Sequence, residues 1–382
     1  MEFGVFDHIE HLPGVALEAL YRDRLTLIEQ FDRDGFYAYH LAEHHTPAVH
    51  SMAPSQNVFL ASVAQRTTRL RFGPCVYVLP LHHPLRLVEE VSMLDNLSGG
   101  RLEIGVGRGG VLEAYFWGQR PDPAANERRY QETLDILRSG LTSETLSYAG
   151  EFHQFDDVPM RLRPKQRPHP PLWYMRNSET AAREGMHCVV VGSLDTLEAN
   201  VRRYQRLWAV HQGAGALTPQ GDVAKIGLVM HVVLAQTDEA ALAIAQPAWE
   251  AYQWNLGTPR RLEAERRQLT DLLGKMESGK FKGAWPEHHR APEDRAAIDE
   301  ALAALSEAEL TERARRRRAP GGVNAGVIAG TPASVREYMD EYVATGANYF
   351  VASFQWGDIS HEDAARSAAL WASDVMPHYT SV

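Results

Sequence analysis

Eight short apolar runs recur along the 382-residue chain, and helical patterns separate most of them. The runs are rich in β-branched and aromatic residues with little polar alternation, which is typical of parallel strands buried on both faces. They span residues 2–6, 37–41, 70–79, 102–106, 171–175, 188–191, 225–235 and 348–354. The helical patterns include residues 19–31, 56–65, 84–97, 128–137, 196–210 and 333–345. Eight strands that alternate with helices predict a single-domain α/β protein over residues 1–382, a (β/α)8 TIM barrel.

An open, doubly wound sheet is the alternative arrangement of the same elements. Its dinucleotide-binding form has a glycine-rich turn after the first strand and an acidic residue about 20 residues later. In this chain the glycine-rich sequence GVGRGG (105–110) follows the fourth strand, and no acidic strand end follows at that distance. The position of the glycines therefore favours the barrel.

Two insertions interrupt the alternation. Residues 146–170 contain the hairpin-like sequence LSYAGEFHQFDDV and a connector rich in Pro and Arg, so we expect a hairpin after the fourth strand. Residues 258–324 form a long polar stretch without strand signals after the seventh strand. A long connection at that end of a barrel is typical of a mobile lid over the active site, although a helical excursion on the surface fits the same pattern.

Composition and charge exclude several classes of function. The chain has 39 Lys and Arg against 49 Asp and Glu, a formal net charge of −10, which argues against nucleic-acid binding. The arginine cluster RARRRR (313–318) lies among glutamates, so we interpret it as a solvated or lid-tethering segment. No apolar run reaches the ~20 residues that span a membrane. No signal peptide is evident, and the two isolated cysteines suit a reducing compartment, so we expect a cytoplasmic protein.

Polar residues that follow the strands would converge at one mouth of the barrel. Glu43, His44 and His45 come directly after the second strand. Because side chains alternate along an extended segment, Glu43 and His45 share one direction and His44 points the other way. The zinc spacings HExxH and His-x-His on the first strand are absent, so we expect no metal site. His44 is suited to proton transfer, whereas Glu43 could equally be a buried carboxylate that accepts backbone N–H groups.

Other polar residues at strand ends suggest a pocket for an anion or a cofactor. They include Asp7, His8, Arg108, Arg176, Asn177, Ser178, Thr180, Ser193, Gln355 and Trp356. Arg108 lies between glycines, which let the backbone approach a bulky ligand while the guanidinium grips a phosphate. Asn177 or Ser178 caps the helix that starts in RNSETAAREG (176–185), and the N–H groups of a helix start suit a phosphate. Ser178 alone could simply cap this helix.

Several stretches match one family in order along the chain. They are FGVFDH (3–8), LAEHHTP (41–47), the block 70–109 with LDNLSGGRLEIGVGRG, AGTPASVREYMDEYVATGANYFVASF (329–354) and SDVMPH (373–378). In these stretches the chain resembles the luciferase-like, flavin-dependent monooxygenases, the family of the bacterial luciferase α subunit. The resemblance covers most of the chain outside residues 258–324. It implies a barrel that binds reduced FMN at its mouth and reacts it with O2 to a flavin hydroperoxide.

The resemblance also implies roles for particular residues. Glu43 would lie close to the flavin ring, and His44 matches the catalytic histidine of the family. Cys75 and Val76 match the site of a non-proline cis peptide bond beneath the ring. Arg108 matches the phosphate-binding arginine. Ser178 and Thr180 fall near the phosphate-binding helix, and Asn177 and Ser193 complete the expected cofactor-binding set.

Two departures from the family pattern stand out. Gly107 replaces the reactive cysteine that precedes the arginine in the luciferase α subunit. The loop after the fifth strand is shorter than the usual family form, which leaves Arg176 and Asn177 as competitors for the phosphate. The assignment of Ser178 and Thr180 depends on how this loop is built.

The resulting functional prediction is a reduced-FMN-dependent monooxygenase that inserts one oxygen atom from O2 into a small, apolar organic substrate. The pocket walls would come from Phe6, Tyr77, Trp173, Phe354 and Trp356, although the same residues could be barrel core. We expect a separate flavin reductase to supply the reduced cofactor, and the family resemblance suggests a homodimer. The alternatives are a deazaflavin-dependent hydride-transfer oxidoreductase and a non-catalytic flavin-binding subunit.

Overall fold

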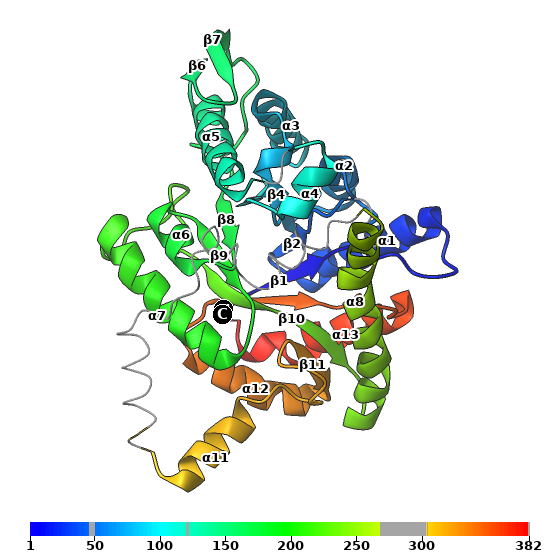
Figure 1. Cartoon of the computed structure of the whole chain (residues 1–382). Coiled ribbons are helices and arrows are strands. Elements are labelled where there is room, and N and C mark those ends of the chain that lie inside the picture. The colour runs from blue at the N-terminus through cyan, green and yellow to red at the C-terminus, as the bar shows by residue number, and fades with distance from the viewer. Residues whose placement is uncertain (46–49, 120–121, 268–302, 304, 381–382) are drawn as a thin grey trace.

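A closed barrel of parallel strands, surrounded by helices, forms the body of the molecule (Figure 1). The computed structural model describes residues 1–45, 50–119, 122–267, 303 and 305–380. The barrel strands are β1 (Glu2–Asp7), β2 (Ala38–Leu41), β3 (Arg71–Pro74) continued by β4 (Tyr77–Val78), β5 (Ile104–Gly107), β8 (Leu172–Met175), β9 (His187–Val190), β10 (Ile226–Leu234) and β12 (Tyr349–Ser353). They pair in parallel in the order β3-β2-β1-β12-β10-β9-β8-β5-β4. A bridge between Phe72 and Leu102 joins the two ends of this order, so the predicted barrel is confirmed.

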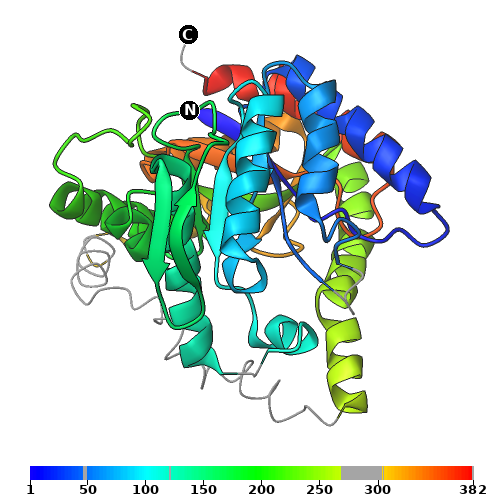
Figure 2. The same cartoon turned by 90° about the horizontal axis from the view of Figure 1, so that it is seen from above.

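Helices cover the outside of the barrel, as both views show (Figures 1 and 2). They are α1 (Leu17–Asp34), α2 (Gln56–Arg66), α3 (Pro84–Leu97), α4 (Val111–Phe116), α5 (Pro123–Thr142), α6 (Ser178–Arg183), α7 (Leu194–His211), α8 (Asp238–Arg266), α11 (Glu307–Arg316), α12 (Pro332–Ala344) and α13 (His361–Asp374), with the 3-10 turns η1 (Leu79–Leu81) and η2 (Met376–His378). All six helices predicted from periodicity are present. Among the helices of the described residues, none is both long and apolar enough to cross a membrane.

The sequence explains where these helices form and end. In α1, the buried residues Leu20, Leu27 and Phe31 recur at seven- and four-residue spacings and so lie on one face of the helix, in the hydrophobic core. Gly35 ends the helix in the left-handed conformation, with φ of 84°, and its N–H donates to the carbonyl of Phe31. The chain can therefore turn directly into β2.

Some elements differ from the sequence-based prediction. The expected strand 70–79 is interrupted at the Cys75–Val76 peptide bond, which is cis. An extra strand, β11 (Val327–Gly330), was not predicted and pairs with the second half of β10. Strands β6 (Thr145–Ala149) and β7 (Gln154–Pro159) form an antiparallel hairpin in the first expected insertion, and it projects from the body beside α5 (Figure 1).

The second expected insertion, residues 258–324, is described only at its two ends. Helix α8 runs past its first residue to Arg266, and α11 lies near its end. Residues 268–302 and 304 lie outside the described residues. The lid therefore stays a prediction.

A buried carboxylate lies at the end of the barrel where the strands begin. Glu103 precedes β5 and is fully buried. It accepts hydrogen bonds from the Tyr37 hydroxyl at 2.7 Å, the Arg71 guanidinium and the Trp173 indole N–H. Burial alone would raise the pKa of Glu103, but the charge of Arg71, together with His187, His40 and the Tyr37 hydrogen bond, outweighs it and the pKa is lowered. Glu103 thus ties residues next to β2, β3 and β8 to the start of β5.

Replacing Glu103 with Ala should destabilise the fold. The change leaves Arg71 without its buried counter-ion and two donors without an acceptor, so we expect a loss of about 3–5 kcal/mol of unfolding free energy at pH 7. Because the folded pKa of Glu103 is depressed, its ionised form favours folding at neutral pH, and this contribution disappears as the pH falls through the carboxyl range. Denaturant unfolding at pH 7 and pH 4 should therefore show a smaller acid effect in the variant.

The matched control is Glu89→Ala, which removes an exposed glutamate from α3. It should change the unfolding free energy by no more than about 0.5 kcal/mol. Equal stability of the two variants would contradict the role given to Glu103.

Candidate active site

The strand register brings the predicted mouth residues to one end of the barrel. Asp7 of β1 is level with Leu41 of β2, and Val78 of β4 is level with Gly107 of β5. Val106 is in turn level with Tyr174 of β8. Because the strands are parallel, the loops that follow them meet at the same end, where barrel active sites are built.

Glu43 is the most completely enclosed of the predicted catalytic residues. Its side chain has no exposed surface. The carboxylate accepts hydrogen bonds from the backbone N–H of Val78 at 2.9 Å and contacts His45 Nε2 at 2.7 Å and His82 Nε2 at 2.9 Å. Burial alone would raise the pKa of Glu43, but His82 and His45 outweigh it and lower the pKa. This arrangement matches the alternative of a buried carboxylate that supports the backbone.

His44 points to a different group from its two neighbours, as the alternation along the strand predicted. Its Nδ1 lies 3.2 Å from Oε1 of Glu113 in α4, and about a fifth of its side chain is exposed. The His44 ring is 5.5 Å from the ring of His8 and 4.8 Å from that of His50. His44 therefore belongs to a histidine cluster that Glu43 and His45 do not enter.

Aromatic side chains border this histidine cluster. Tyr252 of α8 lies 5.3 Å from the His50 ring and 4.4 Å from that of His231. Trp356 lies 4.9 Å from His231. Of the five expected wall residues, Phe6 lies against the cluster, with its ring 4.9 Å from that of His8, and Trp356 lies beside His231. The other three, Tyr77, Trp173 and Phe354, are also buried, and Trp173 donates a hydrogen bond to Glu103 at the far end of the barrel.

The Cys75–Val76 segment lies between β3 and β4, and its peptide bond is cis, as the family resemblance implied. The side-chain amide of Gln56 donates to the carbonyls of Leu41 and Val76, which holds the segment against β2. Burial raises the pKa of the Cys75 thiol to about 12, so Cys75 stays protonated. A Cβ atom on Gly107 would lie 2.5 Å from the Val76 side chain, which explains why a glycine suits this position.

Arg108 is buried beside β5 and forms an ion pair with a partly exposed partner. Its Nη1 lies 2.5 Å from Oε2 of Glu127, whose side chain is 51% exposed. Asn126, the residue before Glu127, donates to the backbone carbonyl of Arg108 at 3.1 Å. The start of α5 thus places a carboxylate against Arg108, the arginine that matches the phosphate-binding arginine of the family.

The loop after β8 is built differently from the expected phosphate site. Asn177 caps α6 by accepting from the N–H of Thr180, and the Ser178 hydroxyl donates to Asn200 of α7. Ser193 caps α7. Thr180 lies in the first turn of α6 and is partly exposed. Arg176 is exposed and has a left-handed backbone, with φ of 74°. Asn177, Ser178 and Ser193 therefore have clear structural roles.

Sequence reasoning missed several members of this site. His50, Glu113 and Glu127 lie in loops or at helix starts with no recognisable spacing. His8 was noted as a mouth residue but not as a neighbour of His44. The sequence did contain a signal that places His8 near His44. His8 comes one residue after β1, and β1 and β2 are adjacent in the barrel, so residues that follow these two strands lie close together.

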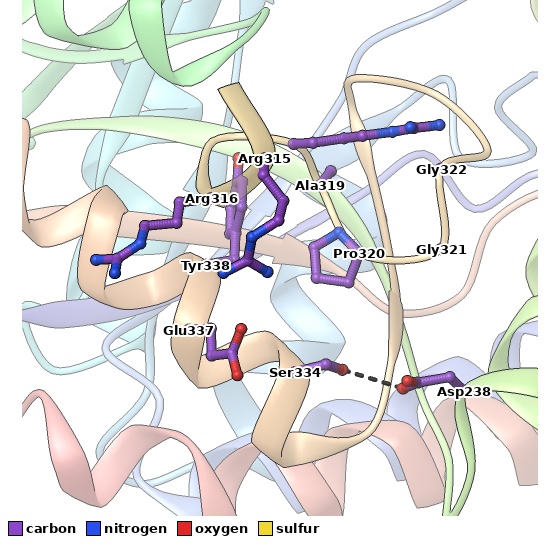
Figure 3. A pocket seen from close by; sticks show the side chains of 11 residues that line it. Asp238, Arg315, Arg316, Ala319, Pro320, Gly321, Gly322, Ser334, Glu337 and Tyr338 are labelled. Atoms are coloured by element: carbon purple, nitrogen blue, oxygen red, sulfur yellow. Dashed lines mark hydrogen bonds between the residues drawn. The ribbon is translucent and has the colours of Figure 1, made fainter. Parts of the chain in front are cut away.

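A separate cavity of about 410 Å3 lies beside the arginine cluster (Figure 3). Arg315 and Arg316 line it, and both pair with Glu312. Asp238 and Glu337 also line the cavity. On the same helix, Arg317 binds Asp195 and Glu198 of α7. The cluster is therefore largely neutralised and attaches α11 to the barrel, in agreement with a tethering role.

Comparisons with known proteins point to one family. The family model described as luciferase-like monooxygenase matches residues 1–349. The uncharacterized protein y4wF of Sinorhizobium fredii is 42% identical over 257 residues, which are 66% of this chain and 72% of that protein. The oxygenase component of the flavin-dependent trigonelline monooxygenase of Acinetobacter baylyi is 31% identical over 45% of this chain, and the match spans about half (48%) of that protein.

Solved structures share the fold over the whole chain. The monooxygenase RslO1 from Streptomyces bottropensis matches with a TM-score of 0.70 and 23% identity, over 100% of both chains. The oxygenating constituent of 3,6-diketocamphane monooxygenase from Pseudomonas putida, solved in complex with FMN, matches with a TM-score of 0.69 and 18% identity. That match covers 100% of this chain and 99% of the other. At these identities the likeness concerns the fold.

Replacing Glu43 with Gln should lower the pKa of His82. Burial alone would lower that pKa, and the negative charge of Glu43 is the main reason why it is raised instead. Without that charge, the His82 pKa should fall below 6.5, the ordinary value. NMR titration of the histidine ring signals measures this shift. Glu113→Gln, which alters the partner of His44 instead, should leave the His82 pKa unchanged, and a His82 shift in the control only would contradict the assignment.

Proposed function

Because this chain belongs to the luciferase-like monooxygenase family, as its motifs predicted, we propose that it uses reduced FMN and O2 to insert one oxygen atom into a small apolar organic substrate. The predicted enzyme class, a flavin-dependent monooxygenase, is confirmed at the level of the family. FMN as the cofactor, the oxygen insertion and the substrate class are the proposal.

The observation that carries the proposal is that two suitable side chains lie at the same mouth of the barrel. A partly exposed histidine, His44, and a buried arginine, Arg108, both follow barrel strands at the same end. A guanidinium suits a phosphate, and an imidazole suits proton transfer near neutral pH. The FMN in the similar camphane enzyme supports the same choice of cofactor.

The residues present fit FMN in charge and in shape. Arg108 is the residue that would hold the phosphate, with Arg176, Asn177, Ser178, Thr180 and Ser193 as the neighbouring candidates. Gly107 has no side chain and so leaves room for the Val76 side chain, and the flat ring would lie against this Cys75–Val76 segment. Bound reduced FMN would supply the electrons that activate O2, which protein side chains do not.

His44 would take up and release the proton that the reaction requires. With Nδ1 facing Glu113, the ring presents Nε2 for proton exchange, and the carboxylate stabilises the charged imidazolium. Glu43 would act indirectly, because its carboxylate contacts His82 and accepts a hydrogen bond from the N–H of Val78. We therefore propose that Glu43 positions the segment 75–78 next to the cofactor. The predicted lid would exclude water from the mouth.

Two partners belong to the proposal. A similar protein is named an oxygenase component, which supports a separate flavin reductase as the source of reduced FMN. A homodimer is the second. Helices α2 and α3, which follow β2 and β3, expose Val58, Met93 and Leu97, and such apolar side chains suit an interface between two copies.

Oxygen consumption tests the proposed function. Purified protein supplied with reduced FMN by a separate reductase should consume O2 and oxygenate a small apolar ketone, terpene or aromatic test substrate. His44→Ala should lower the rate by about 100- to 10,000-fold while FMN still binds. His153→Gln, a histidine on the distant hairpin, is the control. Hydride transfer with reduced deazaflavin and no O2 uptake would support the alternative enzyme, and an unchanged rate in His44→Ala would remove the catalytic assignment.

Phosphate recognition is tested by two opposite substitutions. Arg108→Ala should weaken FMN binding by about 10- to 100-fold, since a charged hydrogen bond contributes about 1.5–3 kcal/mol. Glu127→Gln should strengthen FMN binding, because the Glu127 carboxylate forms an ion pair with Arg108 and so competes with the phosphate for it. Riboflavin lacks the phosphate and serves as the control ligand. Fluorescence titration should show no such changes for riboflavin, and equal effects on both ligands would place the phosphate elsewhere.

A further inference from the structure

Three imidazoles from two neighbouring strand ends surround one point at the barrel mouth. His8 follows β1, His44 follows β2, and His50 lies farther along the connection from β2 to α2. One ring nitrogen of each lies within 4.8 Å of the other two. The His8 and His50 rings are 4.0 Å apart. His8 and His50 are both buried, so the imidazoles are held together by the fold and do not merely meet on the surface.

Carboxylates lie behind two of the three rings. Oε1 of Glu113 is 3.2 Å from Nδ1 of His44, and Oε2 of Glu10 is 3.9 Å from Nδ1 of His50. The contact with Glu113 orients the His44 ring so that Nε2 points away from the carboxylate, which is the usual arrangement behind metal-bound histidines. Glu10, at 3.9 Å, is too far from His50 for a hydrogen bond and is a nearby acidic group only. Glu10 is itself held by Asn255 of α8 at 2.8 Å and by the N–H of Gly357.

One nitrogen of the cluster also lacks a partner within the described residues. Nδ1 of His8 is buried and makes no hydrogen bond there. A buried polar atom of this kind calls for a ligand, and a divalent ion shared by the three rings would supply one.

We propose that His8, His44 and His50 bind one divalent transition-metal ion that favours imidazole nitrogen, such as Zn2+. Zinc–nitrogen bonds of about 2.0–2.1 Å require the three nitrogens to lie roughly 3.3 Å apart. The nitrogens, which lie within 4.8 Å of one another, would therefore have to approach by up to about 1.5 Å on metal binding. The fourth position would remain for water.

An ion at this site would occupy the nitrogen through which His44 exchanges protons. Metal binding and turnover would then exclude each other, and Zn2+ would act as an inhibitor. This consequence for turnover rests on the proposed function, whereas the metal site itself does not. Binding is therefore measured without flavin.

Calorimetric titration of the metal-free protein with Zn2+ tests the site. We expect one ion per chain with micromolar affinity, and at least a tenfold loss of affinity in both His8→Gln and His50→Gln. The control is His153→Gln, since the ring of His153 lies 5.5 Å from that of His83, outside the buried cluster. The control should bind Zn2+ like the unaltered protein.

Cobalt absorption provides a test that does not depend on the variants folding. Co2+ added to the unaltered protein should give the intense visible bands of four- or five-coordinate cobalt with nitrogen ligands, and Zn2+ should abolish them. Failure of the unaltered protein to bind Zn2+ at one ion per chain would overturn the proposal. So would binding that survives both His8→Gln and His50→Gln, or that is lost in His153→Gln. If the protein binds Zn2+ as expected but shows no FMN-dependent O2 uptake, only the proposed function fails.

Discussion

The buried carboxylate of Glu103 is the interaction on which the closed barrel depends most directly. The sheet closes where β3 and its continuation β4 meet β5, through the bridge between Phe72 and Leu102 and the β4–β5 pairing nearer the mouth. Glu103 follows Leu102 and binds Arg71, which precedes Phe72, so a charged pair lies beside the bridge. The side-chain contacts of Glu103 therefore reinforce this junction at the end of the barrel where the strands begin. The strand ends at the mouth depend on the closed ring for their positions.

The two ends of the barrel use carboxylates in the same way for different purposes. At the closed end, Glu103 is surrounded by groups that fix the fold. At the mouth, Glu43 is equally enclosed and organises the Val78 backbone and His82 beside the segment predicted to contact the cofactor. His44 is more exposed and lies among ionisable rings. Glu43 and His44 therefore have different surroundings because their side chains leave opposite sides of the same extended segment.

Much of the fold could be predicted from the sequence, because buried parallel strands leave long apolar runs. Strand β11 escaped notice because its short apolar run, residues 327–329, lies between Gly326 and Gly330 just after the long polar stretch 258–324. The direction of His44 could be predicted from alternation, and Arg108 from its glycines. Glu113, Glu127 and His50 could not, because their places depend on how α4, α5 and the loop after β2 fold back over the mouth. The roles of Asn177 and Ser178 as a cap and an inter-helix contact depend in the same way on the packing of α6 against α7.

The opposite orientations of His44 and His45 have a consequence for how this chain can change over time. Their side chains leave a single extended segment, so their surroundings are fixed by counting residues from Leu41. Point substitutions in the mouth leave that count intact and can vary the pocket one contact at a time. Insertion or deletion of one residue before Glu43 would exchange the two environments, sending the enclosed histidine to the mouth and the mouth histidine to the buried carboxylate. We therefore expect descendants of this sequence to differ in the residues around the segment far more readily than in its length.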